Sequence, residues 1–297
     1  MDWLLFAFIP PMFWAICNVI DKFLLEKYIK DPISYQILIS FFDAVSLIII
    51  LFLSPISGNA YVFLLGIMIG ILGLVATTLY NKSMLDEEAS RVVPLVYLDS
   101  IFVVILAYIF LGEVFNLQKY LGIILVIAGG ILISLKKIVR KWHFSPTIKF
   151  ILIAGFLWAI SSVISKYTLN FTDYFSLTAF QMLGYIVFGP LFLFSNRARM
   201  NFLSCIKRFD RKVFLLMIIV TLIYLVGVLS FYFAVSISSI SLVYAIASTQ
   251  PFFIFAYMLI ITKIAPSIVK EEIDKSTVLL KIIAICLIFL GTFFIGS

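Results

Sequence analysis

The sequence predicts an all-α polytopic membrane protein with ten transmembrane helices, arranged as two inverted five-helix repeats. Hydrophobic residues make up 64% of the 297 positions and charged residues only 12%, whereas soluble domains have about half apolar and about a quarter charged residues. One segment also occurs twice, because residues 13–22 read FWAICNVIDK and residues 157–166 read LWAISSVISK. Each copy begins a run of five apolar segments, and an odd number of spans makes the second copy enter the bilayer from the opposite face.

The predicted spans are apolar windows long enough to cross a hydrocarbon core of ~30 Å. They lie at 3–25, 33–53, 61–80, 92–111, 119–135, 148–168, 175–194, 213–233, 242–262 and 278–296. The first window has neither a basic start nor a cleavage site, so we expect a retained span and not a signal peptide. The two repeats divide the chain into residues 1–140 and 141–297.

The basic residues predict the orientation of these spans. When the loops are counted in order, the odd-numbered loops carry 18 of the 22 Lys and Arg residues. The even side has only Lys119 and Lys281, while Lys22 and Lys166 lie at helix ends. Loops rich in Lys and Arg stay in the cytoplasm. We therefore expect a plasma-membrane or inner-membrane protein with both termini outside, whose net charge of +7 serves orientation and headgroup contact and does not bind nucleic acid.

The chain has no pattern typical of cofactor, metal or nucleophile chemistry. Its three cysteines lack CxxC spacing, its single histidine, His143, lies in a basic loop, and it has no glycine-rich nucleotide loop. We therefore expect no catalytic residue, no metal and no cofactor. The acidic clusters at 86–88 and 271–274 are flanked by basic residues in predicted loops and are interpreted as solvated turns.

Ionisable groups inside a membrane span are costly, so each is a hypothesis for a functional site. Asp43 and Asp99 lie midway along their windows, and an apolar surrounding favours the neutral carboxyl that a proton-exchanging group needs. Asp99 is the better candidate, and an interhelical hydrogen bond is its alternative role. Prolines inside spans add candidate hinges. The predicted coupling or gating residues are Asp99, Asp43, Lys22, Lys166, Pro94 and Pro251.

Polar and aromatic residues of both copies predict a binding cavity between them. Trp14 and Trp158 lie too deep for an interfacial aromatic belt, and Asp99 of the first copy aligns with Gln250 of the second. The predicted binding residues are Trp14, Asn18, Asn81, Tyr97, Asp99, Trp158, Gln181, Tyr244 and Gln250. Each residue alone could instead hold helices together, and the sequence leaves that alternative open.

Short motifs frame the fourth and fifth windows: Ala89-Ser90, then YLDS at 97–100, then LGE at 111–113 and YLG at 120–122. Together they resemble the EamA repeat of the drug/metabolite transporter superfamily. This resemblance covers both halves and implies ten helices around a central substrate cavity, with secondary export or exchange of small metabolites. The sequence departs from the family pattern at 99–100 and 250–251, where a Glu-Pro pair is typical, so the substrate is not implied.

The residues and the resemblance together predict a secondary active transporter, an exporter or exchanger of a small polar or amphipathic metabolite, that works by alternating access between the repeats. A flippase for a lipid-linked precursor is the alternative within transport, favoured by Lys22 and Lys166. A membrane-embedded transferase is the alternative of another class. The expected partners are the small-molecule substrate and the lipid bilayer, and a homodimer is left open.

Overall fold

A computed structural model describes residues 2–86, 95–96, 98–134, 146–207, 209–264 and 275–296, which are helical or lie in turns and loops, without a strand. The first half contains α1 (Asp2–Leu24), a π-helical turn (Leu25–Ile29), α2 (Pro32–Leu53), α3 (Ala60–Asp86), α5 (Asp99–Leu111) and α6 (Leu117–Ser134). The second half contains α7 (Pro146–Thr168), α8 (Tyr174–Phe188), a 3₁₀ turn (Gly189–Phe194), α9 (Asn196–Ile206), α10 (Arg211–Ile237), α11 (Ile240–Ala247), α12 (Gln250–Ile264) and α13 (Lys275–Gly296).

The prediction of an all-helical, multi-pass membrane protein is confirmed. Among the described residues, seven helical stretches are long and apolar enough to cross a membrane, and α5, α6 and α13 supply three shorter apolar helices. Each predicted window contains helix. The ninth window differs from the prediction because its helix is interrupted between Ala247 and Gln250. The polar helix α9 lies between the seventh and eighth predicted windows.

Local sequence explains where several helices begin. Asp31, Asp173 and Asp210 precede α2, α8 and α10, and the carboxylate of each accepts a backbone N–H from the first turn of its helix. Such caps satisfy N–H groups that the helix itself leaves without partners. Helix α8 ends at Phe188, shortly before Pro190. There the chain tightens into a 3₁₀ turn, because proline has no N–H to continue the α-helix.

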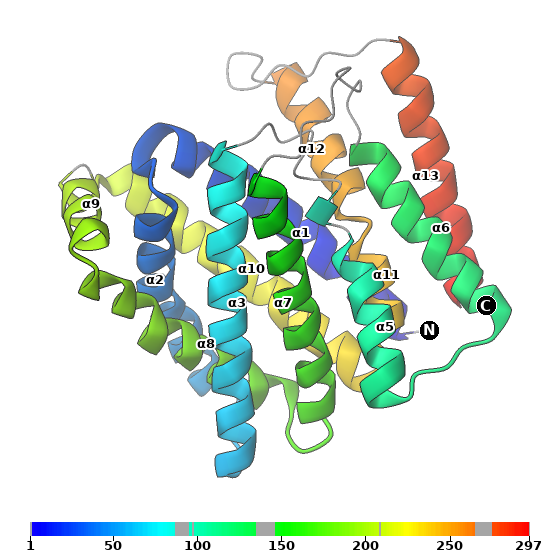
Figure 1. The fold of residues 1–297 in the computed structure, drawn as a ribbon, viewed down its shortest axis with the longest axis horizontal. Helices are drawn as coiled ribbons and strands as arrows, with labels where there is room; N and C mark the ends of the chain where they lie inside the picture. The colour runs from blue at the N-terminus through cyan, green and yellow to red at the C-terminus, as the bar shows by residue number, and fades with distance from the viewer. Residues whose placement is uncertain are drawn as a thin grey trace.

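The two halves pack reciprocally. The first helix of each half lies against the helix of the third window of the other half, since α1 packs on α10 and α7 packs on α3 (Figure 1). The second helices α2 and α8 pair with each other, as do the last helices α6 and α13. Small residues permit the last contact, because a Cβ on Gly122 would lie 2.8 Å from the carbonyl oxygen of Gly291.

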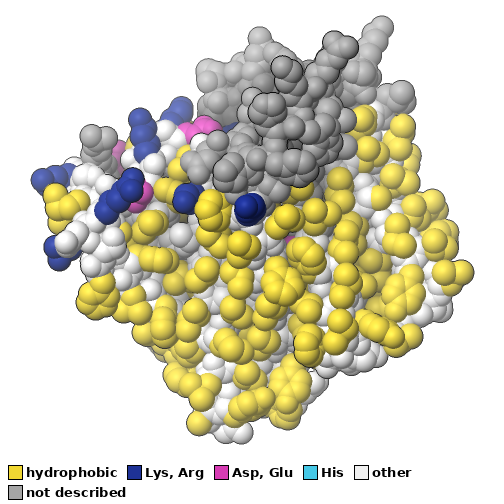
Figure 2. Space-filling view, viewed as in Figure 1, with side chains coloured by type: hydrophobic (Ala, Val, Ile, Leu, Met, Phe, Trp, Pro, Cys, Tyr) yellow, Lys and Arg dark blue, Asp and Glu magenta, His cyan; other side chains and the backbone are white. Residues whose placement is uncertain are grey.

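The surface separates apolar sides from a basic end. Figure 2 shows hydrophobic side chains over the flanks of the bundle and Lys and Arg side chains gathered at one end. Exposed apolar residues such as Phe52, at 88% exposure, suit contact with lipid.

The prediction that Lys281 lies with Lys119 on the side of the even-numbered loops was wrong. It lies in the first half of α13, which begins at the basic end, and its buried ammonium stands 3.5 Å from the centre of the Phe255 ring.

At the other end of the bundle, loops of the two halves are joined by hydrogen bonds. The Asp173 carboxylate accepts the backbone N–H groups of Phe175 and Ser176 and the hydroxyls of Ser176 and Ser57. The Thr172 hydroxyl donates to the Ser57 carbonyl at 2.8 Å. Partial burial alone would raise the pKa of Asp173, but these hydrogen bonds outweigh it and hold that pKa below its usual value.

Replacing Asp173 with alanine should therefore lower the melting temperature more than Asp210→Ala does. Both changes remove a cap worth about 1 kcal/mol, but among the described residues the Asp210 carboxylate accepts only the Val213 N–H of its own helix. Because the folded-state pKa of Asp173 is lowered, its contribution is complete above the unfolded pKa of about 3.9 and is lost as the pH falls through the folded value. The difference in melting temperature from the parent should persist between about pH 8 and pH 5 and shrink below about pH 4. Equal losses for the two variants would contradict the role of the loop contact.

Candidate functional site

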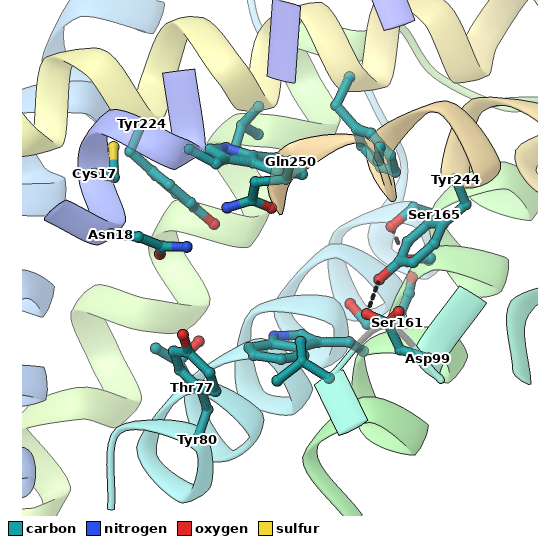
Figure 3. A pocket seen from close by; sticks show the side chains of 18 of the residues that line it. Cys17, Asn18, Thr77, Tyr80, Asp99, Ser161, Ser165, Tyr224, Tyr244 and Gln250 are labelled. Atoms are coloured by element: carbon teal, nitrogen blue, oxygen red, sulfur yellow. Dashed lines mark hydrogen bonds between the residues drawn. The ribbon is translucent and has the colours of Figure 1, made fainter. Parts of the chain in front are cut away.

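A cavity of about 260 Å³ lies between the two halves of the chain. Helices α1, α3 and α5 supply its lining from the first half, and α7, α8, α10, α11 and α12 from the second. Figure 3 shows side chains from these helices turned toward a common space. The cavity is therefore built by residues far apart in the sequence.

The repeated motif contributes the same helical face from each half. The lining residues of α1 are Trp14, Cys17, Asn18 and Asp21, and those of α7 are Trp158, Ser161, Ser162 and Ser165. Within each helix these positions are separated by three, one and three residues, which places them on one side of an α-helix. The two sets are offset by 144 residues, as in the aligned motif. The duplicated sequence thus forms two walls of one cavity.

Interrupted helices bring Asp99 and Gln250 to the cavity. Asp99 is the first residue of α5, and Gln250 is the first residue of α12. The backbone before each is a turn in which Leu98 and Thr249 donate N–H groups to carbonyls three residues earlier. Non-helical backbone at membrane depth is tolerated where it lines a cavity or is buried in protein. Both helix ends therefore present polar side chains to the cavity.

Hydroxyl groups hold the Asp99 carboxylate from both halves. Ser100 donates to one carboxylate oxygen at 3.2 Å, and the Tyr244 hydroxyl of α11 donates to the other at 3.1 Å (Figure 3). The hydroxyls of Ser100 and Ser248 lie 2.5 Å apart. Asp99 is 7% exposed, so these bonds replace most of its contact with water. They also join α5 to the junction of α11 and α12.

A second chain of polar groups crosses α7, α8 and α10. The Tyr232 hydroxyl donates to the side-chain oxygen of Gln181 at 2.8 Å, and the Gln181 amide donates to the Tyr185 hydroxyl at 2.8 Å. Ser165 donates to the Tyr232 hydroxyl at 3.3 Å. Such a network orients the Gln181 amide, so its position at the cavity wall depends on three helices at once.

Aromatic rings form much of the remaining wall. The Trp14 ring stacks on Tyr224, with centroids 6.4 Å apart, and also meets Phe231. Trp158 lies against Tyr80 at a centroid distance of 5.6 Å. Gly227 makes room for Trp14, because a Cβ at that position would lie 2.5 Å from the indole nitrogen. Flat rings and short hydroxyls together suit a ligand with both apolar and polar parts.

The structure brings together eight of the nine predicted binding residues. The cavity is lined by Trp14, Asn18, Asn81, Asp99, Trp158, Gln181, Tyr244 and Gln250. Tyr97 lies outside the described residues, as does the predicted hinge Pro94. The other predicted hinge, Pro251, is the second residue of α12 and directly follows the helix break.

The predicted coupling and gating residues occupy different environments. Lys22 is an exposed surface residue, with its ammonium 3.8 Å from Glu26. Lys166 donates to the carbonyls of Val235 and Ser238, at 2.8 and 2.7 Å, and so caps the C-terminal end of α10. Asp43 is fully buried and does not line the central cavity. Asp99 alone among these ionisable residues lines the central cavity.

Several lining residues were missed by the sequence reasoning. They include the small residues of the repeated motif and the tyrosines of α3, α8 and α10: Cys17, Asp21, Ser161, Ser162, Ser165, Tyr80, Tyr185, Tyr224 and Tyr232. Helical spacing from Trp14 and Trp158 would have found the members of the repeated motif. Nothing in the sequence distinguishes the tyrosines from residues that face lipid.

The charged groups of the cavity are acidic. Asp21 and Asp99 are its carboxylates, and the described lining includes no basic side chain. Asp21 also accepts a hydrogen bond from the Tyr35 hydroxyl. The described residues contain no group of three or more His, Cys, Asp or Glu side chains able to hold a metal ion. The arrangement can bind and orient a polar molecule by hydrogen bonds and ring contacts.

Comparisons with known proteins agree with this architecture. Residues 1–135 match the model of the EamA-like transporter family, which belongs to the drug/metabolite transporter superfamily. A solved crystal structure is similar to the chain with a TM-score of 0.72 and 13% sequence identity, covering 99% of this chain and 96% of the other. At that identity the similarity shows the fold alone. None of the curated proteins compared with the chain matches it significantly.

A disulfide should form across the cavity in a Ser100→Cys/Ser248→Cys variant whose three native cysteines are replaced by serine. The two hydroxyl oxygens lie 2.5 Å apart, so sulfur atoms there need only a small shift to reach a bond length of about 2.05 Å. Mild oxidation followed by mass spectrometry of peptides measures the product. The matched control pairs Ser100→Cys with Ser241→Cys, about two helical turns away along α11, and should stay reduced. Equal yields for the two pairs would contradict this geometry.

Proposed function

Because residues 1–135 match the model of the EamA-like transporter family, we propose that the chain is a secondary active transporter of a small polar or amphipathic metabolite. The central cavity is the proposed substrate site. The observation that carries the proposal is the shared lining, in which one face of α1 and the same face of α7 enclose a space of about 260 Å³. A site built at the junction of two repeats is typical of secondary transporters.

The proposed topology has ten spans in two inverted repeats, residues 1–140 and 141–297. Two observations support it. The helix pairs exchange when the halves are exchanged, as in α1 with α10 and α7 with α3. The helix breaks before Asp99 and Gln250 also fall at aligned positions of the repeats. Together with the basic end of the bundle, this proposal places the termini outside the cytoplasm.

The loop contacts support alternating access between the halves. At the end opposite the basic side chains, Glu113 of the first half accepts the N–H groups of Ile240 and Ser241 at 2.8 and 3.1 Å, and the Ser241 hydroxyl at 2.6 Å. Ser57 and Asp173 form the second contact across the halves at this end. We propose that these contacts close the extracytoplasmic side and that they break when the halves rock.

The alternative functions have weaker support. A flippase would use Lys22 and Lys166 to contact a headgroup, but the Lys166 ammonium is engaged by two backbone carbonyls. A transferase would use the acidic clusters at 86–88 and 271–274, which lie outside the described residues except for Asp86 at the end of α3. The cavity favours a small solute because helices of both halves line it.

Counterflow exchange in reconstituted vesicles tests the proposal. Vesicles containing the purified chain and preloaded with one metabolite of a polar and amphipathic panel should take up the labelled form of that metabolite. The same metabolite should raise the melting temperature of the protein, because it binds the native state. Ser162→Trp, which fills the cavity, should abolish both effects, whereas Ser204→Trp on the exposed face of α9 should not. Exchange at the protein-free rate across the panel would reject the proposal.

We further propose that Asp99 couples transport to protons. Asp99→Asn keeps oxygen and nitrogen atoms near Tyr244 and Ser100 but removes the charge that would have to move through the bundle. The variant should retain the melting shift and counterflow but lose accumulation driven by a pH gradient. Asp210→Asn, outside the spans, is the control and should accumulate normally. Gradient-driven uptake by Asp99→Asn equal to that of the parent would remove Asp99 from this role.

The proposed orientation has its own test. In a chain without native cysteines, Asn59→Cys should react with a membrane-impermeant thiol reagent in whole cells, because the loop before α3 lies at the end opposite the basic side chains. Met200→Cys, on the exposed face of the basic α9, should react only after the cells are permeabilised. The reverse labelling pattern would invert the topology.

A further inference from the structure

A smaller cavity of about 90 Å³ adjoins the central one. It lies among α1, α2, α3, α8 and α10, and its lining therefore also comes from both halves. Six residues line both spaces: Cys17, Asp21, Thr77, Asn81, Tyr185 and Tyr224. A cavity needs about 10–15 Å³ of volume to hold one water. The smaller cavity therefore has room for an ion with a few waters and is too small for most metabolites.

Asp43 gives this side cavity an uncompensated carboxylate. It lies midway along α2, is 1% exposed, and its Oδ2 has no hydrogen-bond partner. The described residues that line the side cavity include no Lys, Arg or His. A buried charge without a partner is strongly unfavourable. The carboxylate therefore requires a positively charged partner or a proton.

A second oxygen in the same lining also lacks a partner. Thr221 of α10 is 2% exposed, and its hydroxyl makes no hydrogen bond in the structure. The side-chain amides of Gln36 and Asn81 bring further oxygen atoms to the lining. Carboxylate, hydroxyl, amide and water oxygens are the ligands that hard cations prefer. The side cavity thus combines a negative charge, neutral oxygens and space.

We propose that the side cavity binds one monovalent cation of the size of Na⁺, with Asp43 and Thr221 as its protein ligands. A cation with bound water satisfies both orphan oxygens at once and fills the space. A proton on Asp43 would remove the charge but would leave the Thr221 hydroxyl and the volume unused. A divalent or transition metal is disfavoured because the described residues hold no group of three or more His, Cys, Asp or Glu side chains.

The titratable groups around Asp43 do not supply the missing charge. They are Cys17 and Asp21 on α1, Tyr35 on α2, Tyr185 on α8 and Tyr224 on α10. All of them are neutral or negative, and Asp21 already accepts the Tyr35 hydroxyl. Tyr185 and Tyr224 also line the central cavity. If the proposed transport function holds, occupancy of the ion site would therefore alter the wall that contacts the substrate.

The binding of Na⁺ is tested on the full-length protein in detergent, without any transport substrate. Melting temperatures are compared in NaCl, KCl and choline chloride at constant ionic strength and at pH 7.5 and 9. In the parent, Na⁺ should raise the melting temperature saturably, by about 3–6 °C at concentrations far above its dissociation constant. Asp43→Asn should abolish this increment, and Thr221→Val should shift the midpoint to at least about tenfold higher Na⁺, an effect of 1.4 kcal/mol. Binding of ²²Na⁺ at one ion per chain provides a second measurement.

Asp99→Asn is the matched control, because Asp99 lines the central cavity and not the side cavity. This variant should keep the full Na⁺ increment. Equal melting temperatures in the three salts at both pH values would overturn the proposal in favour of a protonated Asp43. A Na⁺ increment that persists in Asp43→Asn would also overturn it, because Na⁺ would then bind away from the side cavity. Because neither measurement uses a metabolite, a failed ion test leaves the counterflow result intact, and a failed counterflow test leaves the ion result intact.

Discussion

The absence of water in the bilayer core is the constraint on which this structure depends. Every backbone N–H and C=O group at that depth must find a partner within the protein, and continuous helices provide those partners. Two departures from regular helix lie just before Asp99 and just before Gln250, and there the turns keep their own hydrogen bonds. Both departures adjoin the central cavity. The irregular backbone and the proposed substrate site thus occupy the same place for one physical reason.

The duplicated motif turns one helical face into two walls of a cavity. Trp14 and Trp158 have equivalent positions on α1 and α7, but their partners differ, since Trp14 meets Tyr224 and Phe231 whereas Trp158 meets Tyr80. The acidic Asp21 of the first wall corresponds to the neutral Ser165 of the second. Symmetry of the backbone therefore coexists with an asymmetric distribution of charge, which allows a ligand one preferred orientation.

The side chains that connect the halves fall into two groups with different exposure. Glu113 and Asp173 form their contacts in loops near solvent, where water can replace each bond at little cost. The contact between Ser100 and Ser248 lies deep in the protein, where an unmade bond is expensive. A rocking motion that breaks the loop contacts while it preserves the deep one would have the lower barrier. If the halves rock as proposed, we therefore expect the pivot at the hydroxyls between α5 and the α11–α12 junction.

Composition and pattern alone determined the helical class, the windows of the spans, the basic end of the bundle and eight residues that the structure places at one cavity. These features follow from local rules, because a span needs about 20 apolar residues and a helical face needs only fixed spacing. Asp43 and Asp99 show where such rules stop, since both are lone carboxylates in the middle of apolar windows. Only the tertiary structure distinguishes them, because Asp99 meets the hydroxyl of Tyr244, 145 positions away in the chain, while Asp43 faces a cavity without a basic side chain in its described lining. The sequence contains both residues, but which partner each one meets is decided by how distant helices pack.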